Sequence, residues 1–254
     1  MQRDEVRDLS RVPVFNAPTV VIVLIGTLAV VHAGLSLVAT SLADRMIYAL
    51  AFVPARYDGA AEGPGSPWAA ATSFLTHALV HGSLTHLLIN AAWLLAVGTP
   101  LARRMSTTGF LAFFALCAAG GAVAFWGANI GLETPMVGAS GAISGLMAAV
   151  FRLIYAATGP GERGLLREHP ELAPRLSLRA TLSNRACLTA IAVWVALNVL
   201  VGVGVGGTDA PGGIAWEAHL GGFLTGLLAF GLFDRGPAAI DRSTGNSADM
   251  ADQP

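Results

Sequence analysis

Six long runs of apolar residues, each nearly free of charge, constrain this chain more than any other feature. They lie at about residues 19–43, 84–102, 108–129, 140–157, 186–206 and 215–233. A helix needs about 20 apolar residues to cross the hydrocarbon core of a bilayer, and each run approaches that length. Only 12% of the 254 residues are charged, against roughly 25% in soluble domains. The runs predict an integral membrane protein and exclude a soluble or nucleic-acid-binding domain.

The same runs predict the fold class. They lack the alternation of polar and apolar residues that is typical of membrane barrel strands, so helices are the elements that satisfy the backbone in lipid. We predict an all-α, polytopic membrane protein, a bundle of six transmembrane helices that forms one domain over residues 19–235. Residues 1–18 are predicted to be a cytoplasmic N-terminal segment, and residues 236–254 a disordered cytoplasmic tail.

The placement of arginine predicts which ends of the spans face the cytoplasm. All 15 basic residues are arginine, and all but Arg45 and Arg56 fall on one side of the predicted spans. Short arginine-rich loops stay in the cytoplasm, so both termini are predicted to be cytoplasmic. Residues 1–17 contain three acidic residues and fit neither a secretory signal nor a transit peptide. Because we attribute the arginine-only composition to GC-rich coding, we predict a bacterial inner membrane.

The first two spans are separated by a segment, about residues 44–83, that is too long for a simple connector. Its centre is rich in glycine and proline, and its flanks, Met46 to Val53 and Trp68 to Leu79, are apolar. The flanks predict short helices in the outer membrane interface, where tryptophan is favoured.

Polar side chains inside the spans are candidate functional residues, because they are unfavourable in lipid unless paired or hydrated. The second span opens with His81, His86 and Asn90, of which the last two lie four residues apart on one helix face. The fourth span opens at Ser140, where unpaired backbone N–H groups favour negative charge. The sixth span carries His219 near its outer end.

Helical rise and glycine spacing predict that these residues meet. At about 1.5 Å per residue from the charges at the inner ends, Ser140, His219 and His86 lie at overlapping depths, roughly 4 to 12 Å below the outer surface. The pairs Gly141-x-x-x-Gly145 and Gly222-x-x-x-Gly226 let the fourth and sixth helices approach closely. Packed together, they bring Ser140 within hydrogen-bond reach of His219, as a nucleophile with its general base.

Each signal alone has a plainer interpretation. Ser140 can be an ordinary helix cap, His219 an interfacial histidine satisfied by water, and the glycine pairs plain helix packing. The string His81-x4-His86-x3-Asn90 is much rarer than the serine motif. A transporter that uses histidines as a proton relay is a further alternative, but the chain lacks the internal repeats of many transporters.

Taken in order, the motifs resemble those of the rhomboid intramembrane serine proteases. The resemblance covers about residues 20–233 and includes six spans and a long first outer loop. Its motifs are His81-x4-His86-x3-Asn90, Gly138-x-Ser140-Gly141 and Ala218-His219-x2-Gly222-x3-Gly226. It implies an intramembrane serine endopeptidase that hydrolyses peptide bonds in or near transmembrane segments of membrane protein substrates, with an active site open to the outer side.

The resemblance also implies roles for single residues. Ser140 is the nucleophile and His219 the general base of a dyad with no third acid, since Glu217 points to another helix face. His86 and Asn90, with the Ser140 N–H, form the oxyanion hole. Gly138 and His81 are supporting residues, and His81 and His77 hold water at the entrance of the helix.

Partners and cofactors follow from the same resemblance. Transmembrane protein substrates and the lipid bilayer are the expected partners, and nucleic acid is not. No cofactor and no metal is expected, and the oligomeric state stays open. A flexible cap loop is expected at Gly202 to Gly213, and a lateral gate at the fifth span.

Two positions depart from the pattern of many rhomboids. Thr72-Ser73 stands where many members carry a Trp-Arg pair, which leaves the bonding within the first outer loop open. Ser144 stands where several members carry an aromatic residue that stacks on the histidine. Ser144 is expected to fill a close helix contact rather than to bond near His219. The alternative function is a catalytically inactive rhomboid-like factor that binds membrane proteins, although such relatives lose the serine or the histidine.

Overall fold

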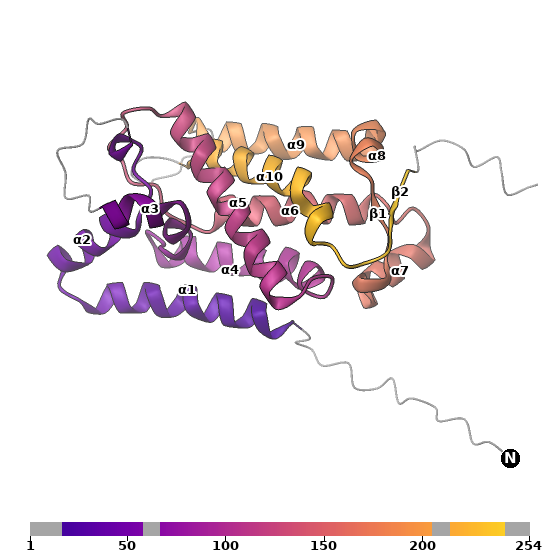
Figure 1. Ribbon diagram of the computed structural model, residues 1–254, viewed down its shortest axis with the longest axis horizontal. Coiled ribbons are helices and arrows are strands. Elements are labelled where there is room, and N and C mark those ends of the chain that lie inside the picture. Colours follow the sequence, from indigo (N-terminus) through magenta and orange to yellow (C-terminus); the bar gives the residue numbers. More distant parts are fainter. Residues whose placement is uncertain (1–16, 58–66, 205–213, 242–254) are drawn as a thin grey trace, which may run out of the picture.

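The structure, a computed structural model, describes residues 17–57, 67–204 and 214–241, and within these ranges it is a bundle of helices (Figure 1). The α-helices are α1 (Thr19–Leu37), α2 (Thr40–Leu50), α3 (Pro67–Thr76), α4 (Leu84–Ala102), α5 (Thr107–Ala128), α6 (Ser140–Ile154), α7 (Pro160–Glu168), α8 (Leu178–Ser183), α9 (Arg185–Gly202) and α10 (Trp216–Phe233). Three 3-10 turns are η1 (Pro54–Arg56), η2 (His77–Leu79) and η3 (Pro170–Leu172), and two short strands are β1 (Arg175–Leu176) and β2 (Ala239–Ile240).

Six of the helices, α1, α4, α5, α6, α9 and α10, correspond to the six predicted runs. Four of them, α1, α4, α5 and α9, are long and apolar enough to cross a membrane. The other two are less apolar or shorter, since α10 carries Glu217 and His219 and α6 has 15 residues. The all-α, polytopic membrane fold is therefore confirmed, and the number of crossings stays a prediction.

Helix α6 lies at the centre of the bundle, which explains its short length. It packs against α4, α5 and α10, and most of its residues are buried. Leu146 and Leu153 of α6 share the main core with Phe110 and Phe113 of α5. Because its neighbours are protein rather than lipid, α6 does not have to match the thickness of the hydrocarbon core.

Some helix ends differ from their predicted positions. The first run was predicted at 19–43, but α1 ends at Leu37, Val38 takes an extended backbone, and α2 begins at Thr40. The apolar pattern continues through this break, so it cannot mark it. The fourth run, predicted at 140–157, ends at Ile154, and the fifth, predicted at 186–206, ends at Gly202.

The long loop between the first two spans contains the short helices that its apolar flanks predicted. The first flank forms the end of α2 and leads to η1, and the second forms α3 and η2; residues 58–66 between them lie outside the described residues. Phe52 forms an antiparallel bridge with Met136, with N···O distances of 3.0 and 2.8 Å. This bridge ties the loop to the segment that leads into α6.

The other end of the bundle, the arginine-rich end, is held by buried charges. Arg104 binds both carboxylate oxygens of Asp234, at 2.7 and 2.8 Å, and both side chains are fully buried. Arg175 lies 2.7 Å from the same carboxylate. Arg152, in the last turn of α6, donates to the carbonyls of Leu176 and Leu227. These contacts connect α4, α6 and α10 with β1.

The prediction of a disordered tail from residue 236 is wrong for its first part. β2 pairs in parallel with β1, Ala239 opposite Arg175 and Ile240 opposite Leu176. The pairing uses backbone groups, which a composition of small and polar residues does not reveal. Residues 242–254 of the predicted tail, residues 1–16 of the predicted N-terminal segment, and residues 205–213 of the predicted cap loop lie outside the described residues.

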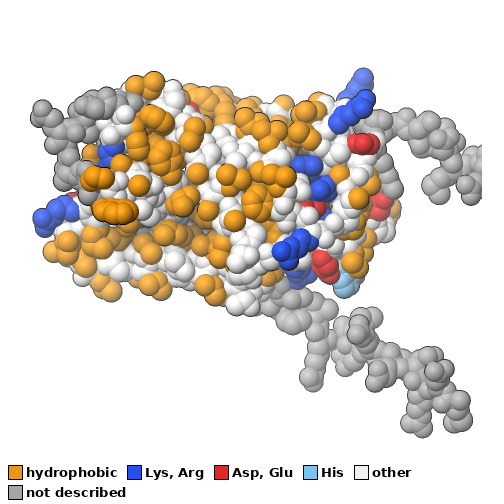
Figure 2. Space-filling model, viewed as in Figure 1, with side chains coloured by type: hydrophobic (Ala, Val, Ile, Leu, Met, Phe, Trp, Pro, Cys, Tyr) orange, Lys and Arg blue, Asp and Glu red, His pale blue; other side chains and the backbone are white. Residues whose placement is uncertain are grey.

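The surface between the two ends is apolar. Figure 2 shows hydrophobic side chains along the length of the bundle and basic side chains mainly at the arginine-rich end. Large exposed apolar residues include Val30, Leu37, Leu88, Trp93, Val193, Leu197, Leu228 and Leu232. An apolar surface on several helices is typical of contact with lipid. The start of α1 and strand β2 lie at the same end of the bundle (Figure 1).

Candidate active site

The backbone turn before α6 puts Ser140 at the first position of that helix. Gly138 has φ +121°, a conformation that side chains with a Cβ rarely adopt. A Cβ there would also lie 2.6 Å from Cε1 of His86. The Gly138 N–H donates to the carbonyl of His77 at 2.9 Å, so the turn is fixed from both sides.

Ser140 and His219 form a hydrogen bond across the bundle. The distance from Ser140 Oγ, on α6, to His219 Nε2, on α10, is 2.7 Å. Both residues are partly exposed rather than fully buried. A serine hydroxyl that bonds to an imidazole nitrogen is the arrangement in which the imidazole can take the proton as the oxygen attacks.

Glycines let α6 and α10 come close enough for this bond. A Cβ on Gly222 would overlap the carbonyl oxygen of Gly141, and a Cβ on Gly226 would overlap that of Gly145. A Cβ on Gly145 would in turn lie 2.8 Å from the Gly222 carbonyl oxygen. The predicted pairing of the two Gly-x-x-x-Gly faces is therefore confirmed. Cys117 of α5 packs on the same contact as a free, buried thiol.

The predicted oxyanion residues lie on α4, beside the start of α6. Ser83 caps α4, because its Oγ accepts from the N–H of His86 at 3.1 Å. The His86 ring lies against Gly138, two residues before Ser140. Asn90 is buried and gives one N–H to the His86 carbonyl at 3.1 Å. Its amide carries a second N–H, which can donate to another acceptor.

His81 lies next to His86. Their ring centroids are 5.0 Å apart in an edge-to-face arrangement. His81 is buried, and neither of its ring nitrogens has a hydrogen-bond partner among the described residues. Buried polar atoms are normally paired with protein or water, so this ring is suited to the water-holding role expected from the sequence.

The comparison with protein families completes this picture. Residues 68–235 match the Rhomboid domain, a stretch that contains Ser140, His219, His86, Asn90, Gly138 and His81. The chain belongs to the rhomboid family. Members of this family are intramembrane serine proteases, although inactive members exist. No match was found among curated proteins.

The loop between the first two predicted spans of this rhomboid is held by residues other than a Trp-Arg pair. Ser73 is fully buried, and its Oγ lies 2.7 Å from the hydroxyl of Tyr57. The Ser73 carbonyl accepts from Nδ1 of His77 at 2.8 Å, and His77 binds Gly138. Burial raises the pKa of the Tyr57 phenol. The chain of contacts connects the loop to the turn before Ser140.

Ser144 and Glu217 both lie as the sequence predicted. Ser144 is buried, and its Oγ donates to the Ser140 carbonyl at 2.7 Å rather than to His219. Oε1 of Glu217 lies 3.4 Å from Nδ2 of Asn129, the residue that follows α5. The Glu217 carboxylate therefore lies on another side of α10 from the His219 ring.

The sequence reasoning missed one residue that touches the site. Oδ1 of Asn198, in α9, lies 2.7 Å from Nδ1 of His219. Asn198 is a polar residue inside an apolar run, Ala196-Leu-Asn-Val-Leu200, which is the signal that singled out His86 and Asn90. No motif accompanies it, so the signal was not recognised.

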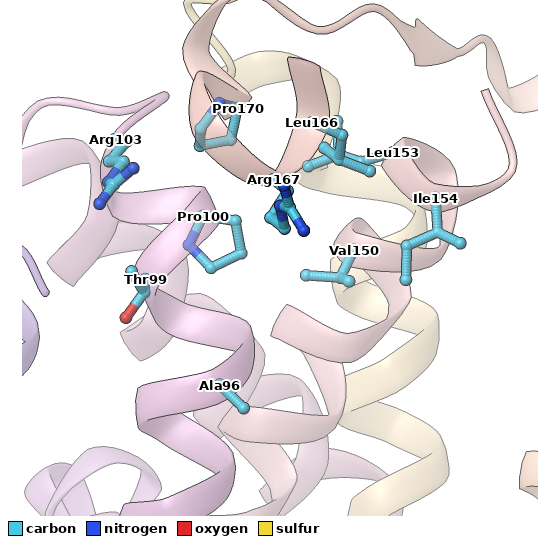
Figure 3. Close-up of a pocket in the computed structure, with 10 residues that line it drawn as sticks. All are labelled: Ala96, Thr99, Pro100, Arg103, Val150, Leu153, Ile154, Leu166, Arg167 and Pro170. Carbon is cyan, nitrogen blue, oxygen red and sulfur yellow. The ribbon is translucent and has the colours of Figure 1, made fainter. Parts of the chain in front are cut away.

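A separate cavity of about 300 Å³ lies at the arginine-rich end, between α4, α6 and the α7–η3 segment (Figure 3). Pro100, Val150 and Leu166 are among its apolar lining residues. Val150 is ten residues from Ser140, about 15 Å along α6, so this cavity is distinct from the Ser140 site. Among the described residues, no group of three or more His, Cys, Asp or Glu side chains is arranged to hold a metal ion.

Proposed function

We propose that this rhomboid is an intramembrane serine endopeptidase with a catalytic dyad of Ser140 and His219. Its substrates are membrane proteins, cleaved in or near a transmembrane segment. The observation that carries the proposal is the 2.7 Å hydrogen bond between Ser140 Oγ and His219 Nε2. The bond joins two residues that are 79 positions apart in the chain. Their helices, α6 and α10, approach through four glycines, which a plain helix cap does not require.

The first half-reaction follows from this geometry. Ser140 Oγ attacks the carbonyl carbon of the scissile peptide bond while His219 Nε2 takes the hydroxyl proton. The resulting imidazolium gives that proton to the nitrogen of the leaving amine as the C–N bond breaks. The products are a free amine and an ester between Ser140 and the acyl part of the substrate.

The second half-reaction restores the serine. His219 Nε2 takes a proton from a water molecule, whose oxygen attacks the ester carbonyl. The ester C–O bond breaks, the proton returns to Ser140 Oγ, and the carboxylic acid product leaves. Water therefore has to reach the dyad, which agrees with the partial exposure of Ser140 and His219.

Each tetrahedral intermediate carries a negative charge on the former carbonyl oxygen. We propose that the Ser140 N–H, the His86 ring and the second amide N–H of Asn90 stabilise it. The Ser140 N–H lies in the first turn of α6, where backbone N–H groups have no acceptor within the helix and the helix dipole favours negative charge. Removal of one such donor typically costs about 2.7 to 4 kcal/mol of transition-state stabilisation.

The proposed orientation places the arginine-rich end in the cytoplasm of a bacterium and the dyad toward the outer side of its inner membrane. Arg104, Arg152 and Arg175 lie at the end of the bundle away from Ser140. Cytoplasmic enrichment of arginine supports this orientation. Both termini would then be cytoplasmic, and the proposed partners are transmembrane substrates and the surrounding lipid.

The test is cleavage of single-span substrates, with small residues near the outer interface, by the purified protein in liposomes. The wild type is expected to release two fragments, and Ser140→Ala and His219→Ala to release none, with mass spectrometry to locate the cut. Ser36→Ala, on α1, and His169→Ala, in the exposed pair with Glu171, are controls that should keep the wild-type rate. Cleavage that persists in both dyad variants would exclude this mechanism.

A further inference from the structure

The side chain of Asn198 contacts the nitrogen of His219 that does not face Ser140. Oδ1 of Asn198 lies 2.7 Å from Nδ1 of His219, and Nε2 of the same ring lies 2.7 Å from Ser140 Oγ. The histidine is therefore held at both ring nitrogens, by residues on α9 and α6. The contact at Nδ1 is not part of a dyad that consists of Ser140 and His219 alone.

A second hydrogen bond of Asn198 fixes the direction in which its amide points. The amide nitrogen, Nδ2, donates to the Trp194 carbonyl, one turn earlier in α9, at 2.8 Å. A carbonyl oxygen accepts and cannot donate, so the amide nitrogen has to face Trp194. The amide oxygen is then the atom that faces His219, and an oxygen there can only accept.

The amide direction determines where the proton of a neutral His219 lies. Since Oδ1 of Asn198 only accepts, Nδ1 of His219 must carry the N–H. A neutral imidazole has one N–H, so Nε2 carries the lone pair and accepts from the Ser140 hydroxyl. In the opposite tautomer, Nδ1 and Oδ1 would face each other as two acceptors, and Nε2 could not take the serine proton.

We propose that Asn198 is a positioning residue that holds His219 in the Nδ1–H tautomer required of a general base. This inference rests on the proposed function, in which His219 is that base. Asn198 touches neither Ser140 nor the reacting atoms in the described structure. Its effect is to orient the ring and to accept from Nδ1–H in both the neutral and the protonated ring.

The contact makes the base dependent on the position of α9. Cys187, at the far end of α9, is the one buried residue of this helix. Near Asn198, α9 is held against α10 by Trp194, whose ring stacks on Phe223 with centroids 4.4 Å apart. If α9 separates from α10 at this level, His219 loses its partner at Nδ1.

The test compares the imidazole nitrogens of His219 in the wild type and in variants of Asn198, each labelled with nitrogen-15 histidine and held in lipid nanodiscs. The signals are assigned by their loss in His219→Ala. The wild type is expected to show a protonated Nδ1 and an unprotonated Nε2. Asn198→Leu, which is of similar size and has no acceptor, is expected to give a mixture of the two tautomers. Asn198→Asp, which keeps an oxygen acceptor, is expected to restore the wild-type pattern.

Kinetics on a cleaved substrate provide the second readout. In Asn198→Leu, kcat is expected to fall at least about tenfold, because the wrong tautomer cannot accept the serine proton. KM is expected to stay within about twofold, and Asn198→Asp to recover most of the lost kcat. Thr189→Val, an exposed residue of the same helix whose hydroxyl bonds one turn back, is the control that should change neither readout.

The two readouts separate this inference from the proposed function. An Nε2–H tautomer in the wild type, or a spectrum unchanged in Asn198→Leu, would overturn the role of Asn198 even if the protein is an active protease. The proposed function would instead be overturned if the wild type has the Nδ1–H tautomer but the Ser140→Ala and His219→Ala variants cleave substrate as fast as the wild type. A rise in KM in Asn198→Leu, with kcat unchanged, would also contradict a positioning role.

Discussion

Gly138 is the residue whose replacement should damage the site most without removing any functional group. Its φ of +121° disfavours any side chain, and an added Cβ would lie 2.6 and 2.8 Å from Cε1 and Nε2 of His86. Either Ser140 or the His86 ring would have to move. The geometry of the site therefore depends on the lack of a side chain at Gly138 as well as on Ser140 and His86.

We expect Gly138→Ala to lower the rate of substrate cleavage by about a hundredfold or more, because a shift of about 1 Å in a reacting group has that effect. The assay is cleavage in liposomes. Gly131→Ala is the matched control, because Gly131 also has a positive φ, +76°, but has no atom within 4 Å of an added Cβ. If both variants lose the same cleavage activity, the loss comes from backbone strain rather than from a clash with His86.

The sequence predicted several residues of the site through their motifs. The Ser140–His219 contact, the separation of Glu217 and the packing of Ser144 all agree with the structure. Asn198 was missed, because its partner lies on a helix 21 residues away in the chain. A lone asparagine in an apolar run does not reveal which neighbour it faces, since that depends on how α9 packs on α10.

At the scale of elements, the close approach of α6 and α10 positions the dyad. Gly226 and Gly145 lie in backbone contact one turn below the level at which Gly222 meets Gly141. Small residues at such positions allow helices to pack through van der Waals contact in lipid. The four glycines therefore set the distance between the two helices that carry Ser140 and His219.

Gly226→Ala is expected to push the helices apart, because its Cβ would overlap the Gly145 carbonyl. Overpacking of this kind costs about 1 to 3 kcal/mol of stability, and the displaced dyad should lose cleavage activity by about a hundredfold. Gly231→Ala, on the same helix, adds a Cβ whose nearest atom is Arg175 Nη2 at 3.6 Å. Both variants are compared by cleavage rate and thermal unfolding; full activity in Gly226→Ala would contradict the role of the glycine contact.

Helices were predictable from apolar runs, but some of their ends were not. The run predicted at 84–102 has the same bounds as α4. Ser83 caps the start of this helix, and two arginines follow its end. The break between α1 and α2 at Val38 has no such signal, since neither glycine nor proline stands there. The pairing of β2 with β1 was missed because it joins backbone groups that lie 64 residues apart.

At the scale of the whole molecule, the two ends of the bundle differ in what holds them. The end with Ser140 is joined by neutral hydrogen bonds, such as those of Ser73, Tyr57 and His77. The arginine-rich end is joined by the buried Asp234 carboxylate, which is the shared counter-charge of Arg104 and Arg175. The charged cluster connects α4, β1 and the end of α10, so it stabilises the bundle from the end opposite the dyad.

Asp234→Asn is expected to lower the free energy of unfolding by about 3 to 5 kcal/mol, because it leaves buried arginines without a counter-charge. The measurement is the thermal unfolding midpoint in detergent, with chemical denaturation to obtain the energy. Glu168→Gln removes a carboxylate whose side chain is 63% exposed in its pair with Arg167, and should change stability by less than about 0.5 kcal/mol. Equal stability of Asp234→Asn and the wild type would show that the buried cluster does not hold this end together.

Activation of Ser140 by His219 can be measured directly by labelling the purified protein with a fluorescent fluorophosphonate. This probe reacts with activated serines, so no substrate has to be known. We expect the wild type to be labelled, and Ser140→Ala and His219→Ala not to be labelled. If a folded wild type stays unlabelled beside an active rhomboid that is labelled, Ser140 is not activated by His219, and the protein is an inactive, membrane-protein-binding member of the family.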